Sequence, residues 1–220
     1  MTTFVRTFAL AALATVLLAA CSLPLLEPID LEGGVFGLDG VEVTLAAIAP
    51  TSIAPSATAS FSGAIAETFV VEDADIPPVL RNLFKVASVD EAIGLNVALV
   101  ATSAGELPAS FVVSAASLTD LMIRKGVQTV FSGGFSTITG ATMAFSRVAP
   151  CTGICSYTAS ATTALADISL SGDEADKLAK AIIAGGTFTV TGNFVASVSP
   201  ALPDDTQIQV SLVSLGAVLE

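Results

Sequence analysis

The chain has 220 residues, of which 53% are hydrophobic and only 13% are charged, and it carries a formal net charge of −12 with no histidine. Such an acidic surface repels a phosphate backbone, which argues against nucleic acid as a partner. The missing histidine removes the commonest general base and metal ligand, so Ser-His-Asp and Cys-His catalysis are excluded.

The first residues predict an export signal. Arg6 is the only charge before Glu27, and Phe8 to Ala20 is apolar apart from Thr15. A basic start, a short apolar core and small residues at its end are typical of a secretory signal. The alternative is a transmembrane or buried helix. The length disfavours a span, because about 20 Å of helix is short of the roughly 30 Å of bilayer hydrocarbon.

The end of this stretch, Leu18-Ala19-Ala20-Cys21, resembles the lipobox of bacterial lipoproteins. The resemblance implies residues 1–20 as a signal peptide, diacylglycerol on the Cys21 thiol and acylation of the new amino terminus. At about 0.8 kcal/mol per buried methylene, three acyl chains would anchor the protein permanently. The membrane is then a partner through this lipid. Ser22, where Asp would retain the protein in the inner membrane, implies the outer membrane in a Gram-negative cell.

Removal of residues 1–20 would leave Cys21 to Glu220, which is 200 residues. Loss of Arg6 would leave 7 basic residues against 20 acidic ones, a balance of −13. This length suits a single domain. We place the domain at 31–220, behind a proline-containing tether at 21–30.

Cys151 and Cys155 are the two cysteines that remain after lipidation of Cys21. An exported pair predicts a disulfide. The loop that it closes is short, so we expect it to fix a turn and to stabilise the fold at the low end of the usual ~2–4 kcal/mol. The alternatives are less favoured. A redox site usually has a two-residue spacing at a helix start, and two thiolates without histidine fall short of a zinc shell.

Alternation of apolar and polar residues predicts strands through most of the domain. They fall at 41–45, 60–72, 93–117, 127–147, 156–165, 187–198 and 207–212. We expect a hairpin at 93–117 with its turn at 103–106, and a second strand pair at 127–147 that is broken at Gly133-Gly134. The last two strands would form a further hairpin. The two halves echo each other weakly, as a duplicated unit would.

Two helices interrupt the strands. Asp173 to Ala184 carries an apolar stripe at helical spacing, and Gly185-Gly186 ends it. Ser171 and Glu174 match a capping box at its start. The second helix, at 76–88, follows a proline pair and has apolar residues at helical spacing.

Paired acids are the remaining candidates for chemistry, because they could serve a glycosidase or a calcium site. The groups are Glu72-Asp73-Asp75, Asp90-Glu91, Asp173-Glu174-Asp176 and Asp204-Asp205. All are expected at the ends of elements, where acids solvate turns and cap helices. Ser-Lys catalysis would need one of only four lysines, and three of these fall on or beside predicted helix surfaces. We predict no cofactor, no metal and no catalytic residue.

The expected fold is mainly β, an antiparallel sandwich or a curved sheet or half-barrel with two short helices. The expected protein is a membrane-anchored bacterial envelope lipoprotein with a non-enzymatic structural or interaction role, for example with another envelope protein. The alternative is a carrier of a lipid or other apolar ligand in a cavity between sheet and helices. The twelve phenylalanines could line such a cavity, although core packing is the plainer interpretation.

Overall fold

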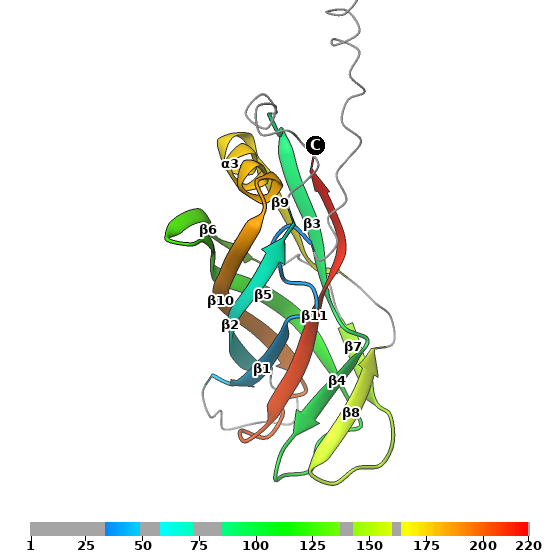
Figure 1. The fold of residues 1–220 in the computed structure, drawn as a ribbon. Coiled ribbons are helices and arrows are strands. Elements are labelled where there is room, and N and C mark those ends of the chain that lie inside the picture. The colour runs from blue at the N-terminus through cyan, green and yellow to red at the C-terminus, as the bar shows by residue number, and fades with distance from the viewer. Residues whose placement is uncertain (1–33, 49–57, 73–84, 137–142, 160–163, 220) are drawn as a thin grey trace, which may run out of the picture.

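The structure is a computed structural model that describes residues 34–48, 58–72, 85–136, 143–159 and 164–219. Within these residues the chain forms antiparallel strands and the helix α3 (Figure 1). The prediction of a mainly β fold built on a curved antiparallel sheet is confirmed. The elements are β1 (Glu42–Ala47), β2 (Ala59–Val71), β3 (Ser88–Leu95), β4 (Ala98–Thr102), β5 (Ser110–Lys125), β6 (Gln128–Ser136), β7 (Met143–Arg147), β8 (Ile154–Ala159), β9 (Ala164–Ser171), α3 (Gly172–Ile183), β10 (Gly186–Ser199) and β11 (Gln207–Leu219).

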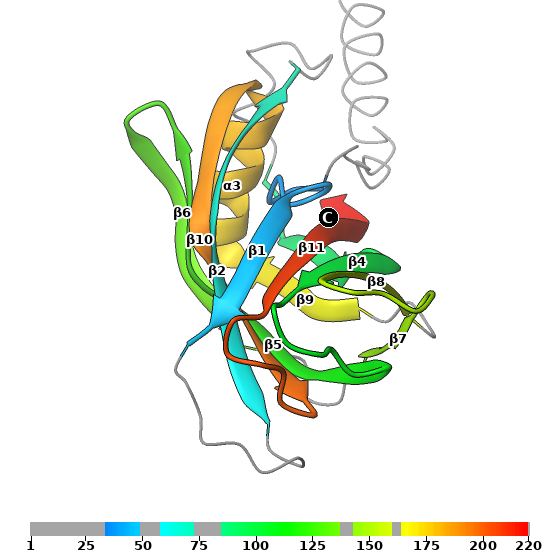
Figure 2. The same ribbon diagram turned by 90° about the horizontal axis from the view of Figure 1, so that it is seen from below.

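Part of the sheet closes into a ring, which Figure 2 shows from below. The order around the ring is β1-β2-β10-β5-β7-β8-β4-β11, and β11 pairs back onto β1. At this closure Val43 lies opposite Val210, and both side chains are buried. The sheet therefore curls further than the predicted half-barrel, because its two edges pair with each other.

Beyond the ring, the long strands separate into two sheets. β2, β10, β5 and β6 continue as one sheet, whereas β11, β3 and β9 form the other. Helix α3 connects β9 to β10 at this end of the molecule and packs against β3, β6 and β9 (Figure 1). The helix thus bridges the two sheets at the place where the ring has opened.

The predicted helix at Asp173 to Ala184 is confirmed within one residue at each end. Its buried face is the predicted apolar stripe, Ala175, Leu178, Ala179, Ile182 and Ile183. The chain then leaves the helix through Gly185 and Gly186, whose φ angles are +59° and +108°. Glycine reaches such angles without the steric cost that a Cβ would bring.

The predicted capping box is wrong. Ser171 is the N-cap residue, but its side chain makes no capping hydrogen bond. Ser171 also ends β9, where it pairs with Ser88, and its backbone remains extended. Gly172, at a φ of +66°, turns the chain into the helix. The strand therefore fixes the direction of the Ser171 side chain.

The second predicted helix, at 76–88, lies almost entirely outside the described residues. Its described end is not helical, because residues 85–87 have no regular structure and β3 begins at Ser88.

The three predicted strand pairings are wrong, and the first strand of the predicted 93–117 hairpin is divided into β3 and β4 at residues 96–97. β4 and β5 are separated in the ring by β7 and β8, and β10 and β11 are separated by β2 and β1. β6 runs through Gly133-Gly134 without a break. β6 and β7 each pair with a different part of β5 instead of with each other. The physical reason is loop length. The connections at 103–109 and 200–206 are long enough to cross the ring end, whereas hairpins favour loops of about two residues.

Among the described residues, a continuous hydrophobic core fills the ring and the space between the sheets. Its largest fully buried side chains include Tyr157 and six phenylalanines: Phe36, Phe61, Phe111, Phe145, Phe188 and Phe194. In the described residues these phenylalanines pack as core.

Candidate functional site

Three loops gather at the end of the ring that lies away from α3, at the bottom of Figure 1. They are the β4–β5 loop (103–109), the β7–β8 loop (148–153) and the β10–β11 loop (200–206). The antiparallel ring places them together, because β4, β7 and β10 end here and β5, β8 and β11 begin here. We call this surface the loop end.

The Cys151–Cys155 disulfide is present, as predicted, with the two Cα atoms 5.4 Å apart. It closes the β7–β8 loop around Gly153, whose φ of +79° makes the turn. The Gly153 carbonyl accepts a hydrogen bond of 3.1 Å from the Ser103 backbone N–H. The loop with the disulfide is therefore tied to the β4–β5 loop.

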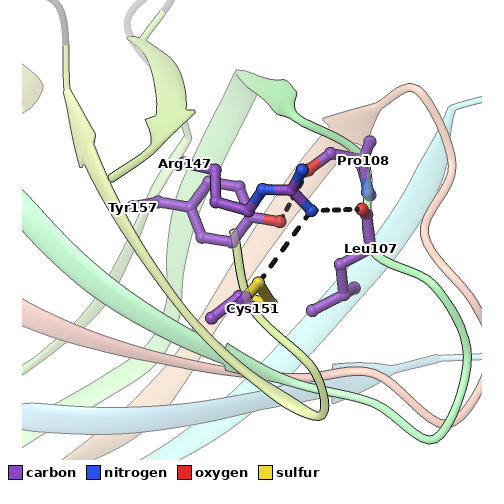
Figure 3. Close-up of a disulfide and its surroundings, with 6 residues drawn as sticks. Leu107, Pro108, Arg147, Cys151 and Tyr157 are labelled. Atoms are coloured by element: carbon purple, nitrogen blue, oxygen red, sulfur yellow. Dashed lines mark hydrogen bonds between the residues drawn. A yellow bond between two sulfur atoms is a disulfide. The ribbon is translucent and has the colours of Figure 1, made fainter. Parts of the chain in front are cut away.

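Arg147, the last residue of β7, holds the other side of the β4–β5 loop (Figure 3). Its Nη1 donates a 3.3 Å hydrogen bond to the Leu107 carbonyl and lies 3.9 Å from the Cys151 Sγ. Its backbone N–H donates to the Ala109 carbonyl at 2.9 Å. One residue thus joins the disulfide to the β4–β5 loop.

Tyr157 supports the same loop from inside the ring. Its side chain is fully buried, and its hydroxyl donates a 2.7 Å hydrogen bond to the Pro108 carbonyl (Figure 3). Its ring packs edge-on against Phe111, with 4.9 Å between ring centroids. Burial raises the pKa of the Tyr157 hydroxyl, and the positive charge of Arg147 only partly opposes this. The phenol therefore stays protonated and able to donate.

Asp205 ties the β10–β11 loop to the β4–β5 loop. Its Oδ1 accepts a 2.7 Å hydrogen bond from the Ser103 hydroxyl, and its Oδ2 accepts one of 2.5 Å from the Ala104 N–H. These bonds favour the charged form and lower the pKa of Asp205. All three loops are consequently joined through residues 103–109.

Two hollows flank the β4–β5 loop. The larger, of about 560 Å³, separates this loop from the β10–β11 loop, and its described lining is Glu106, Leu107, Pro108, Ala109, Arg147, Ala201, Leu202 and Pro203. The smaller, of about 300 Å³, lies toward the disulfide, and its described lining is Ala104 to Leu107, Cys151 to Gly153 and Cys155. Both are surfaces of loops, not of the phenylalanine-rich core.

Two large apolar side chains are exposed beside these hollows. Val148 is 61% exposed and Ile154 is 68% exposed. Both belong to the β7–β8 hairpin, where the Val148 N–H donates to the Ser156 carbonyl. Ile154 and Ser156 share one side of the strand, whereas the intervening Cys155 is buried. The hairpin therefore presents both apolar side chains on its outer side.

The predicted site residues fall in different places. Cys21 lies outside the described residues, as do Asp73 and Asp75. Asp173 and Glu174 occupy the first turn of α3, where the helix dipole stabilises negative charge. Asp204 and Asp205 lie in a loop. In the described part of the chain, no group of three or more His, Cys, Asp or Glu residues is placed to hold a metal ion.

The prediction that Asp90-Glu91 lies at the end of an element is wrong. Glu91 is in the middle of β3 and only 2% exposed. The error follows from beginning this strand at Ile93. If the strand is taken to begin at Ser88, the residues on its buried side include Val89, Glu91 and Ile93. That parity is the sequence signal that identifies Glu91 as an inward-facing acid.

Sequence patterns did not reveal the contacts at the loop end. Arg147 and Leu107 are 40 residues apart, Tyr157 and Pro108 are 49 apart, and Asp205 and Ser103 are 102 apart. Such contacts depend on which strands are neighbours in the ring, and no local motif encodes that.

No helix among the described residues is long and apolar enough to cross a membrane. In comparisons with known proteins, no family model, no curated protein and no solved structure matches the chain.

Proposed function

We propose that the protein is a membrane-anchored bacterial envelope lipoprotein with a non-enzymatic interaction role, and that its loop end contacts a partner protein of the envelope. The lipid on Cys21 would be the anchor. The observation that carries the proposal is the tied loop end, where the disulfide, Arg147, Tyr157 and Asp205 hold three loops together beside exposed apolar side chains.

Loops on a rigid scaffold are the usual carriers of binding residues. Loops that are already fixed lose little conformational entropy when they bind, so more of the contact energy appears as affinity. Val148 and Ile154 supply the apolar surface that the centre of a protein interface needs. The hollows beside the β4–β5 loop are recesses into which side chains of a partner could fit.

The place where the described chain begins supports the same assignment. The described chain begins at Gly34, and Phe36 packs between β3 and β6 in the two-sheet part of the molecule. A tether at 21–30 would join the domain there. The loop end lies at the other end of the long strands (Figure 1), so anchoring would leave it directed away from the point of attachment.

The carrier alternative requires an apolar cavity of roughly 300 Å³ or more. The two described hollows have no phenylalanine in their described lining. Plain core packing of the buried phenylalanines supports the interaction role over the carrier role. An added lipid mass in native mass spectrometry would favour the carrier instead.

The proposal separates into an anchor and a contact surface, and each has a test. Cys21→Ser should abolish incorporation of a labelled fatty acid into the chain, and labelling that persists in this variant would refute the anchor. For the contact surface, Ile154→Asp is compared with Val127→Asp, because Val127 is fully exposed at the β5–β6 turn, away from the loop end. Complexes trapped by a chemical cross-linker in intact cells should be lost with Ile154→Asp and kept with Val127→Asp. Equal yields from both variants would refute the assignment of the surface.

A further inference from the structure

Glu91 makes an unusual contact with the start of the domain. Its Oε2 accepts hydrogen bonds from the backbone N–H groups of Val35, at 2.6 Å, and Phe36, at 2.8 Å. Its Oε1 is buried and has no hydrogen-bond partner. Carboxylates are seldom buried unless they are paired, so this arrangement is costly in its charged form.

The segment that Glu91 holds lies between the two sheets. Val35, Phe36 and Leu38 are each at most 1% exposed. The Phe36 ring packs edge-on against Phe131 of β6, at 5.6 Å, while the Phe36 N–H bonds to Glu91 of β3. Residues 34–38 thus touch both sheets, yet they belong to no strand or helix.

Glycines allow this close approach. Gly34 and Gly37 have φ angles of +78° and +63°, which L side chains rarely adopt. A Cβ at Gly34 would collide with the carboxyl group of Glu91, and one at Gly37 would collide with the ring of Phe69 on β2. The two glycines bracket Val35 and Phe36, so rotation at them can move both residues together.

Burial is the largest influence on the Glu91 carboxyl group, and it raises the pKa to about 7. The hydrogen bonds from the Val35 and Phe36 N–H groups lower the pKa, as does the Ser214 side chain of β11, and the negative charge of Asp39 raises it. Across the β3–β9 pair, Glu91 faces Ile168, which is apolar. The loss of hydration on burial therefore raises the pKa of Glu91 more than the surrounding hydrogen-bond donors lower it.

We propose that Glu91 is a protonation-controlled latch, which keeps residues 34–38 docked between the sheets when it is neutral and releases them when it is ionised. Release would return Glu91 to water, where a carboxyl group titrates near 4.5. Loss of the proton therefore favours release, and docking weakens as the pH rises. This inference goes beyond the proposed partner contact. In a lipid-anchored protein, release would lengthen the tether by a segment whose fully extended span is at most about 17 Å, at roughly 3.5 Å for each of five residues.

The test is hydrogen–deuterium exchange of the full chain in phosphatidylcholine nanodiscs, followed for the peptide that covers 34–38 and corrected for intrinsic exchange. A carboxyl group whose pKa is about 7 docked and 4.5 released should lower protection about tenfold between pH 6 and pH 8. Glu91→Gln should abolish this dependence. The matched control is Asp90→Asn on the neighbouring residue, which should keep it. Peptides from β10 report whether the rest of the fold stays intact.

Two results would overturn the latch: wild-type protection that does not fall with pH, or a fall that persists in Glu91→Gln. Protection of 34–38 that does not change with pH in Glu91→Gln supports the latch, whether that protection is high or low. The amide of this variant can hold or lose the segment, but it cannot ionise. Gly34→Ala provides a second check. Its Cβ would occupy the space of the Glu91 carboxyl group, so protection of 34–38 should be low at both pH values while β10 remains protected.

Discussion

The Tyr157 hydroxyl donates a 2.7 Å hydrogen bond to the carbonyl oxygen of Pro108, a residue 49 positions earlier in the chain. This bond links the inside of the ring to the β4–β5 loop. Tyr157→Phe removes the donor but keeps the ring, so it should lower the free energy of unfolding by about 1–2 kcal/mol. Urea denaturation measures the loss. Ser156→Ala, on the exposed side of the same strand, is the control and should have little effect. A Tyr157→Phe variant as stable as the Ser156→Ala control would show that the bond contributes nothing.

The disulfide should contribute modestly to stability, since it closes a loop with a sequence separation of only 4. Replacing both Cys151 and Cys155 by serine should lower the free energy of unfolding by about 2 kcal/mol. The same variant should raise hydrogen exchange in 148–153, because the covalent bond that closes this loop is then lost. Thr152→Ala leaves the disulfide in place and should match wild type. Unchanged exchange in the serine variant would contradict the role of the disulfide at the loop end.

Gly37 and Gly40 form a matched pair that separates backbone strain from crowding. Both have positive φ, +63° and +72°, but a Cβ at Gly40 has open space whereas one at Gly37 meets the Phe69 ring. Gly40→Ala should therefore cost about 1–2 kcal/mol from strain alone. Gly37→Ala should cost about 1–3 kcal/mol more, because the core is overpacked. Thermal or urea unfolding measures both, and equal costs would show that residues 34–38 are not packed against β2.

Global stability should also depend on the ionisation of Glu91. The folded pKa is raised from 4.5 to about 7, so the stabilising effect is complete below pH 4.5 and is lost as the pH rises through 7. A shift of this size corresponds to about 3 kcal/mol between the two limits. The free energy of unfolding should therefore fall from pH 5 to pH 8 in wild type and in Asp90→Asn. It should stay nearly level in Glu91→Gln. A parallel fall in all three proteins would assign the pH dependence to other groups.

The sequence predicted the elements better than their arrangement. Alternation located the strands around Val43 and Val210, and the apolar stripe located α3, because both patterns are local. It did not predict that Val43 and Val210 face each other across the closure of the ring. That pairing depends on loops that cross the ring end, where hairpins were expected.

The candidate site divides in the same way. The Cys151–Cys155 disulfide was predictable, because the expected export signal and the short spacing of the two cysteines both favour it. The contacts of Tyr157 and Arg147 with the β4–β5 loop join residues that only the ring brings together. Glu91 was missed because of a shifted strand boundary, and its strand parity would have identified it.

The measurement that tests the account most directly is site-specific photo-cross-linking in intact cells. A benzophenone amino acid is placed at Ile154 in one variant and at Val127 in another, both in the chain with Cys21 intact. The two positions are 68% and fully exposed, but only Ile154 lies at the loop end. We predict a discrete cross-linked envelope protein from Ile154, lost when Val148→Asp is added, and none from Val127. The same product from both positions, or a product from Val127 alone, would contradict the loop end as the contact surface.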